Sequence, residues 1–91
     1  MSGVPRFEAF VEVQLRPGIA DPQGATIEKA LPALGFDGLS GVRSGKAFRL
    51  SVEAADEAAA RAKVEDLCRR FLTNPVIEDS TVTLQAPAAV Q

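Results

Sequence analysis

The chain has 91 residues, of which 46% are hydrophobic and 24% are charged, and its formal net charge is −2. This length predicts one domain with a modest core, and the hydrophobic content argues against a chain that is disordered throughout. The slightly acidic balance argues against a nucleic-acid binder, which normally presents a basic face. No apolar run approaches the ~20 residues that a membrane helix needs, so we expect no membrane partner.

Several residue types that support catalysis are rare or missing. The sequence has no histidine and a single cysteine, Cys68, so we expect no internal disulfide and no zinc site. It also lacks the phosphate-binding G-x-x-x-x-G-K-[ST] motif and the G-x-G-x-x-G fingerprint. We therefore expect no cofactor or metal in this chain and no catalysis by the isolated protein. A lone cysteine and the lack of a secretory signal pattern predict a cytoplasmic location.

The first predicted element is a strand over residues 7–16, where apolar and polar residues alternate. Phe10 interrupts the polar face of this strand. It is either a fortuitously exposed aromatic side chain or an anchor for a partner.

The segment after this strand, L-R-P-G-I-A-D-P-Q-G, has more distinctive chemistry than a connector needs. Asp21 is predicted to cap a helix, and Pro22 suits the first helical position because its missing N–H would be unpaired there. Gly24 in the first turn costs ~1 kcal/mol relative to alanine, which indicates close approach by a partner or by another part of the fold. The plain interpretation is a capped helix. The alternative is that the helix start and Arg16 dock a partner loop or an anion.

The next apolar residues have helical spacing and predict a helix lying on a core: Ile27, Ala30, Leu31 and Leu34. Gly35 is a plausible stop for this helix. Pro32 inside the segment predicts a kink or an early end, because proline removes a helical hydrogen bond.

A second unusual turn follows this helix. Residues 39–43 are predicted to form a short strand, residues 44–45 a tight turn, and residues 48–53 another strand. Arg43 and Lys46 flank the glycine of this turn. They could form an ordinary charged hairpin, or they could grip acidic groups on a partner or a phosphate.

A second helix is predicted to start near Asp56 and to end before residues 74–75. The apolar residues predicted to share its buried face are Ala60, Val64, Leu67, Cys68 and Phe71. Residues 81–86 predict a last strand, and residues 87–91 a frayed tail.

These elements have the order β-α-β-β-α-β over a single domain, residues 1–86. They predict an α+β, two-layer sandwich of ferredoxin-like topology, with a mainly antiparallel four-stranded sheet and two helices on one face. The other sheet face would then be bare. Because a small domain usually covers such a face with a partner, we expect a homodimer or a dimer of dimers.

The two turns together resemble the PurS family, the small subunit of phosphoribosylformylglycinamidine synthase. That family has an L-[KR]-x-G-[IV]-x-D-P-x-G loop, then a helix, then a V-R-x-G-K turn, which match residues 15–24 and 42–46 here. The resemblance spans roughly residues 11–84. It implies a PurS-like fold and a non-catalytic subunit of purine biosynthesis. Such a subunit assembles an ATP- and Mg-using synthetase subunit (PurL) with a glutaminase subunit (PurQ) and helps ammonia pass between them.

The unusual turns and the exposed aromatic residue give the candidate partner-interface residues. They are Arg16, Asp21, Pro22, Gln23, Gly24, Arg43, Gly45, Lys46 and Phe10. The strand-to-helix loop also resembles that of ACT-type amino-acid-sensing domains, an alternative that leaves the second turn unexplained. An RNA-recognition domain of the same topology would need several aromatic residues on the open sheet face, where Phe10 stands alone.

Overall fold

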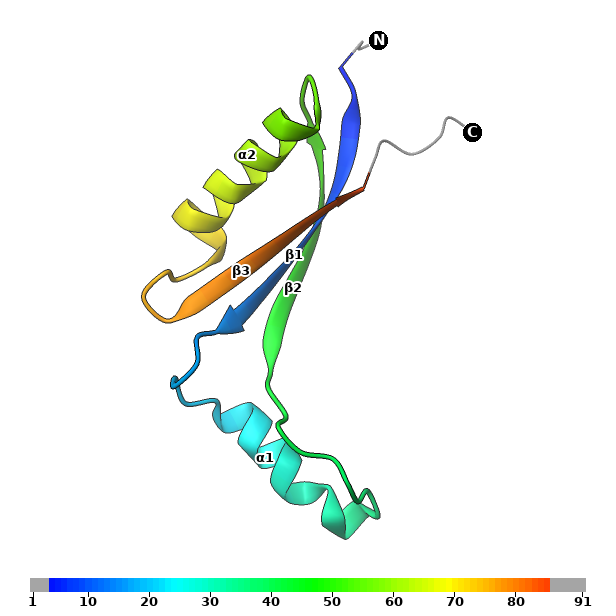
Figure 1. Cartoon of the computed structure of the whole chain (residues 1–91), viewed down its shortest axis with the longest axis vertical. Helices are drawn as coiled ribbons and strands as arrows, with labels where there is room; N and C mark the ends of the chain where they lie inside the picture. The colour runs from blue at the N-terminus through cyan, green and yellow to red at the C-terminus, as the bar shows by residue number, and fades with distance from the viewer. Residues whose placement is uncertain (1–3, 86–91) are drawn as a thin grey trace.

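The computed structural model describes residues 4–85, and its centre is an antiparallel sheet (Figure 1). Strand β1 (Arg6–Leu15) lies in the middle, between β2 (Gly45–Glu53) and β3 (Glu78–Gln85). The sheet has three strands in the order β2-β1-β3, so the predicted four-stranded sheet is wrong. The predicted tail, residues 87–91, lies outside the described residues.

The missing strand is the one predicted over residues 39–43. Gly38 and Gly41, at φ 82° and 70°, adopt left-handed backbone conformations that interrupt an extended chain. Within this stretch, the Val42 N–H donates to the side chain of Glu28. Residues 44–45 therefore form no hairpin turn, and the chain enters β2 directly from this segment.

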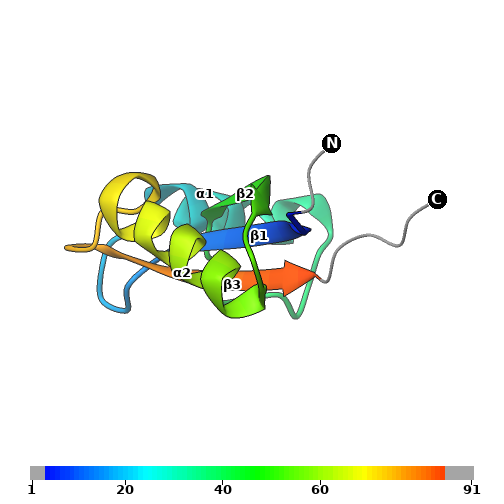
Figure 2. The same ribbon diagram turned by 90° about the horizontal axis from the view of Figure 1, so that it is seen from above.

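Helix α2 (Glu57–Leu67) runs alongside one face of the sheet (Figures 1 and 2). It starts where predicted, because Asp56 caps it by accepting a hydrogen bond from the Ala59 N–H at 2.8 Å. The helix and the sheet enclose one core. Its buried members are Phe7, Ala9, Val11, Val13, Val52, Ala54, Ala60, Val64 and Cys68.

A π-helical turn, η2 (Cys68–Leu72), extends α2 and changes which residues face the core. The Thr73 N–H donates to the Cys68 carbonyl five residues earlier, at 2.9 Å. This wider turn rotates the following side chains away from the helical stripe. Phe71, predicted to be buried, is 81% exposed.

Helix α1 (Pro22–Ala30) lies away from the sheet instead of packing on it, so the prediction of two helices on one face is wrong (Figure 1). The predicted early end is confirmed, because α1 stops before the 3-10 turn η1 (Pro32–Leu34). We call residues 16–44 the α1 arm. The radius of gyration is 17.5 Å, against about 13 Å for a compact domain of 100 residues.

The face of the sheet opposite α2 is open within the described residues. Strand register places Phe10 between Arg49 and Thr83 on this face. Its neighbours are polar: Glu8, Glu12, Gln14, Ser51, Thr81 and Gln85. The described helices include none long and apolar enough to cross a bilayer.

Candidate partner-docking site

The two unusual turns meet at the base of the arm, which we define as residues 16–24 and 42–46. The Asp21 carboxylate accepts hydrogen bonds from the Gly24 N–H at 3.0 Å, the Ser44 N–H at 2.7 Å and the Ser44 hydroxyl at 2.7 Å. One side chain therefore caps α1 and holds together two segments that are 23 residues apart.

This bonding changes the acidity of Asp21. The hydrogen bond from the Gly24 amide, then those from the amide and hydroxyl of Ser44, lower the pKa of Asp21 from 3.8 to about 2. The nearby positive charge of Arg43 acts in the same direction. Asp21 is thus ionised at neutral pH, and its oxygens are engaged in holding the turns.

Residues 42–44 also run closely beside the first turns of α1. A Cβ on Gly24 would lie 2.6 Å from the Val42 carbonyl oxygen, a distance that real Cβ atoms do not adopt. The Val42 N–H donates to the Glu28 carboxylate at 3.1 Å. The glycine in the helix therefore accommodates another part of the same chain, and the arm is fastened at its base.

The cations at the base differ in how they are paired. Arg16 forms an ion pair with Asp79 at 3.3 Å, and Lys46 forms one with Glu78 at 3.7 Å. Arg43 forms no ion pair within residues 4–85, although it is exposed. Exposed ion pairs contribute little stability, so all three cations remain available to acidic groups on a partner.

A cavity of about 430 Å³ opens beside this base, lined by residues 12–15 and 43–47. A smaller one of about 170 Å³ includes Gln23, Lys46 and Glu78. Both are lined by charged and polar residues together with the apolar residues Val13 and Leu15. The described residues offer no group of three or more acidic or cysteine side chains placed to hold a metal ion.

Phe10 is not part of this base. Its ring lies 5.1 Å from the guanidinium carbon of Arg49, a cation–π contact on the open sheet face. A cavity of about 330 Å³ includes both side chains together with Glu8 and Thr83. The nine candidate residues therefore belong to two separate surfaces: Phe10 to the sheet face and the other eight to the base of the arm.

Three residues that complete these surfaces were not singled out from the sequence. Ser44 and Glu28 fasten the base of the arm, and Arg49 covers Phe10. Ser44 had a usable signal, because it lies between the arginine and the glycine of the second turn. Glu28 and Arg49 had none, since their partners are distant in sequence.

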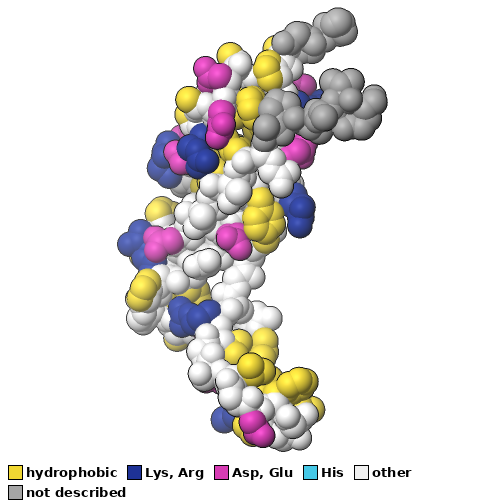
Figure 3. Space-filling view, turned by 45° about the vertical axis from the view of Figure 1, so that its right-hand side comes forward, with side chains coloured by type: hydrophobic (Ala, Val, Ile, Leu, Met, Phe, Trp, Pro, Cys, Tyr) yellow, Lys and Arg dark blue, Asp and Glu magenta, His cyan; other side chains and the backbone are white. Residues whose placement is uncertain are grey.

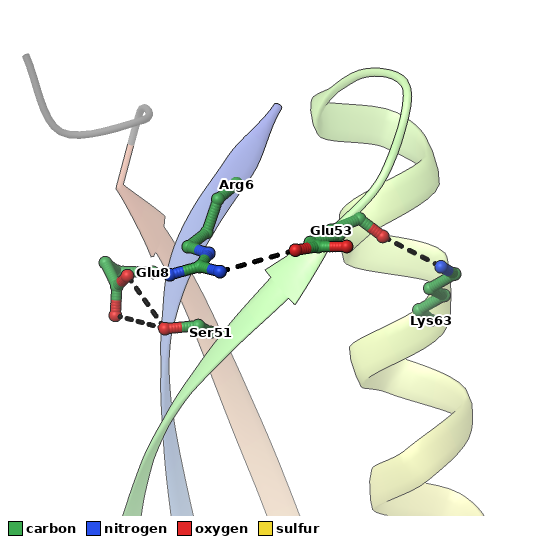
Figure 4. Close-up of polar contacts among 5 residues, drawn as sticks. All are labelled: Arg6, Glu8, Ser51, Glu53 and Lys63. Carbon is green, nitrogen blue, oxygen red and sulfur yellow. Dashed lines mark hydrogen bonds and ion pairs between the residues drawn. The ribbon is translucent and has the colours of Figure 1, made fainter. Parts of the chain in front are cut away.

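The opposite end of the sheet has a different set of polar contacts (Figure 4). Arg6 pairs with Glu53 at 3.3 Å, and the Ser51 hydroxyl donates to Glu8 at 2.9 Å. The Lys63 ammonium donates to the Glu53 carbonyl at 2.8 Å. These exposed contacts join β1, β2 and α2 and make no cluster suited to catalysis.

Comparison with known sequences gives one consistent family. The family model PurS, described as phosphoribosylformylglycinamidine (FGAM) synthase, matches residues 8–86. Among similar curated proteins, the PurS subunit of Synechocystis sp. is 44% identical over 73 residues, covering 80% of this chain and 73% of the relative. That of Mycobacterium leprae is 41% identical over 78 residues, covering 86% and 95%. This match favours the PurS resemblance over the amino-acid sensor.

Solved structures agree with the sequence comparison. A crystal structure of the PurS subunit of phosphoribosylformylglycinamidine synthase from Thermotoga maritima has a TM-score of 0.86 at 33% identity, covering 92% of this chain and 97% of that one. A structure of PurLQS from the same organism contains a chain with a TM-score of 0.83 at 34% identity, covering 89% and 99%.

Proposed function

Since this chain belongs to the PurS family of phosphoribosylformylglycinamidine (FGAM) synthase, a subunit of purine biosynthesis, we propose that it acts as a non-catalytic docking subunit. It joins a synthetase subunit to a glutaminase subunit and supports ammonia transfer between them. A PurLQS assembly is known for a relative from Thermotoga maritima. In this proposal the ATP, Mg and glutamine chemistry belongs to the larger subunits, and the complex is cytoplasmic.

One observation carries the docking role: Asp21 fastens two exposed turns into one surface beside Arg43 and Lys46. A fastened surface loses little conformational entropy when a partner binds, which favours affinity. In this proposal its cations pair with acidic side chains on a larger subunit. The same base of the arm includes the other candidate residues: Arg16, Pro22, Gln23, Gly24 and Gly45.

The test compares two double variants that remove the same number of positive charges. Arg43→Ala with Lys46→Ala removes cations at the base of the arm. Arg69→Ala with Arg70→Ala removes exposed cations that pair with Asp66 near the end of α2. We expect the first variant to bind the synthetase subunit about tenfold or more weakly, with melting shifted little, and the second to bind normally.

The readouts are titration calorimetry with the synthetase subunit, glutamine-dependent activity of the reconstituted complex and thermal melting of each variant. Equal binding by both variants would remove the base of the arm from the docking surface. Sharply reduced melting of the first variant would instead assign its cations to the stability of the chain.

We also propose that the chain is a homodimer or a dimer of dimers. Support comes from the open sheet face with Phe10 and from the arm that lies away from the sheet. Sedimentation equilibrium at micromolar concentration measures this directly. A single species of 9.6 kDa, the mass of one chain, would disprove it.

A further inference from the structure

Two surfaces hold most of the exposed large apolar side chains of the described residues. One is the α1 arm, and Figure 3 shows hydrophobic side chains gathered at that end of the molecule. The other lies between α2 and β3, where Phe71 is 81% exposed and Val76 is 77% exposed. These are the two highest exposures among the large apolar side chains that the structure describes. We call residues 71–77 the α2–β3 corner.

Phe71 is held in its exposed position by the residues on both sides of it. Thr73 donates to the Cys68 carbonyl with its N–H at 2.9 Å and with its hydroxyl at 2.6 Å. Leu72 packs against the core, and Cys68 is part of it. The π-turn thus directs an aromatic ring into solvent from an anchored segment, and π-turns are frequent at functional sites.

Val76 is held in a similar way, by a loop that closes on Asn74. The Asn74 carbonyl accepts hydrogen bonds from the Ile77 N–H at 3.1 Å and the Glu78 N–H at 2.8 Å. Its side-chain oxygen accepts one from the Val76 N–H at 3.1 Å. The Asn74 N–H in turn donates to the Glu78 carboxylate at 2.8 Å. A loop bonded in this way loses little conformational entropy when a partner covers Val76.

The corner is joined directly to the base of the arm. The Glu78 carboxylate that accepts from Asn74 also pairs with Lys46 at 3.7 Å, and its side chain is only 14% exposed. The Arg16 N–H donates to the Ile77 carbonyl at 2.8 Å. The cavity of about 170 Å³ at the base reaches as far as Glu78. In Figure 1 the loop before β3 lies at the end of the sheet where β1 leads into the arm. The base and the corner therefore form one continuous surface.

We propose that the α2–β3 corner is the apolar half of the docking surface. Phe71 and Val76 receive an apolar side chain from the segment of the synthetase subunit whose acidic side chains meet the base of the arm. This inference rests on the proposed docking role and adds the second chemical feature of the partner segment.

The division of chemistry along this surface supports that partner. Exposed ion pairs steer and orient a partner but add little affinity, whereas covered aromatic side chains are common binding hot spots. The cations next to Phe71 do not change this character, because Arg69 and Arg70 pair with Asp66, back along α2. The corner therefore selects an uncharged side chain.

The first test compares two double variants at the same positions. Phe71→Ser with Val76→Ser removes both apolar side chains, and Phe71→Leu with Val76→Ile retains apolar ones. By titration calorimetry with the synthetase subunit, we expect the serine variant to bind about tenfold more weakly and the apolar variant to bind within about twofold of the native chain. The tenfold difference should persist at high salt. The loss caused by Arg43→Ala with Lys46→Ala should shrink there, because salt screens exposed charges.

The second test identifies the occupant by proximity. Val76→Cys places a thiol at the corner, and Val4→Cys places one at an exposed apolar position at the other end of the sheet. Since the native thiol of Cys68 is buried, a benzophenone maleimide labels the introduced one. On illumination of the complex, the label at residue 76 should cross-link to the synthetase subunit and the label at residue 4 should not.

Failure of this inference is distinguishable from failure of the docking role. Normal binding by the serine variant, alongside weakened binding by Arg43→Ala with Lys46→Ala, would overturn the corner and leave the docking role intact. Cross-linking from residue 76 only to a second copy of the chain would assign the corner to self-association and overturn the inference. A sharply lower melting temperature of the serine variant would also overturn it, by assigning these side chains to stability. A native chain that does not bind the synthetase subunit would overturn both proposals.

Discussion

Among the residues of the two turns, Asp21 makes the most side-chain hydrogen bonds. Its carboxylate receives one hydrogen bond from its own helix and two from Ser44. A neutral amide at this position would retain one acceptor oxygen and would place its NH2 group against an amide N–H that now donates to the carboxylate. The negative charge is therefore a structural requirement of the arm, quite apart from any partner.

This requirement predicts a specific pH dependence. Because folding lowers the pKa of Asp21 from 3.8 to about 2, its contribution to stability is complete above pH 3.8 and is lost as pH falls towards 2. Melting curves between pH 5 and 2 should therefore fall more steeply for the native chain than for Asp21→Asn. Asp37→Asn, at an exposed position, serves as the control and should follow the native curve. Parallel curves for the native chain and Asp21→Asn would contradict this account.

Gly24 gives a second prediction at the same scale. Alanine normally stabilises a helix by ~1 kcal/mol relative to glycine, but here its Cβ would meet the Val42 carbonyl oxygen at 2.6 Å. Overpacking of this kind costs ~1–3 kcal/mol. Gly24→Ala should thus accelerate amide hydrogen exchange throughout α1. Thr26→Ala, on an exposed side of the helix, should slow it or leave it unchanged, and slower exchange in both variants would refute the close approach.

At the scale of elements, sequence periodicity located most of the secondary structure. The alternation in β1 and the caps at Asp21 and Asp56 were predictable because they depend on neighbouring residues. The conformation of residues 39–43 was not predictable, because it depends on a hydrogen bond between Val42 and Glu28, which is distant in sequence. The buried position predicted for Phe71 was wrong for a related reason, since a π-turn changes the helical phase without a sequence signal.

The π-turn predicts unequal effects for two members of the same predicted stripe. Val64 is 1% exposed and Phe71 is 81% exposed. Val64→Ala should lower the free energy of unfolding by about 2 kcal/mol, from lost burial and a residual cavity. Phe71→Ala should change it by less than ~0.5 kcal/mol. Urea unfolding of the isolated chain measures both, and a loss at Phe71 as large as that at Val64 would place its ring in the core.

The candidate site, too, was predictable from the sequence only in part. The paired turns were recognisable as unusual from their glycine, proline and charged residues. Their joining through Asp21 and Ser44 could not be predicted, because 23 residues separate the two partners and the local pattern places Ser44 in a hairpin turn. Local chemistry therefore predicted which residues matter, and only the folded chain indicates that they form one surface.

At the scale of the whole molecule, the described chain is long and thin, with principal extents of 56 × 34 × 16 Å. The buried core of the described residues has nine members, which lie in the sheet, in α2 or directly after these elements, at Ala54 and Cys68. The arm contributes no large apolar side chain to that core. In the proposed homodimer a second chain would cover part of this exposed surface, so folding and association should be linked.

This linkage predicts that melting depends on protein concentration. Unfolding enthalpy near 60 °C is about 0.7 kcal/mol per residue, or roughly 130 kcal/mol for a dimer of two 91-residue chains. For a dimer that unfolds to two free chains, mass action then raises the melting temperature by about 4 °C for each tenfold increase in concentration. Calorimetry from 5 to 500 μM should show this slope for the native chain. Ile27→Glu, which places a charge on an exposed apolar position of α1, should melt at a lower and concentration-independent temperature if this position lies in the proposed dimer contact. A native melting temperature that stays constant over this range would mean that the arm adds nothing to stability by association.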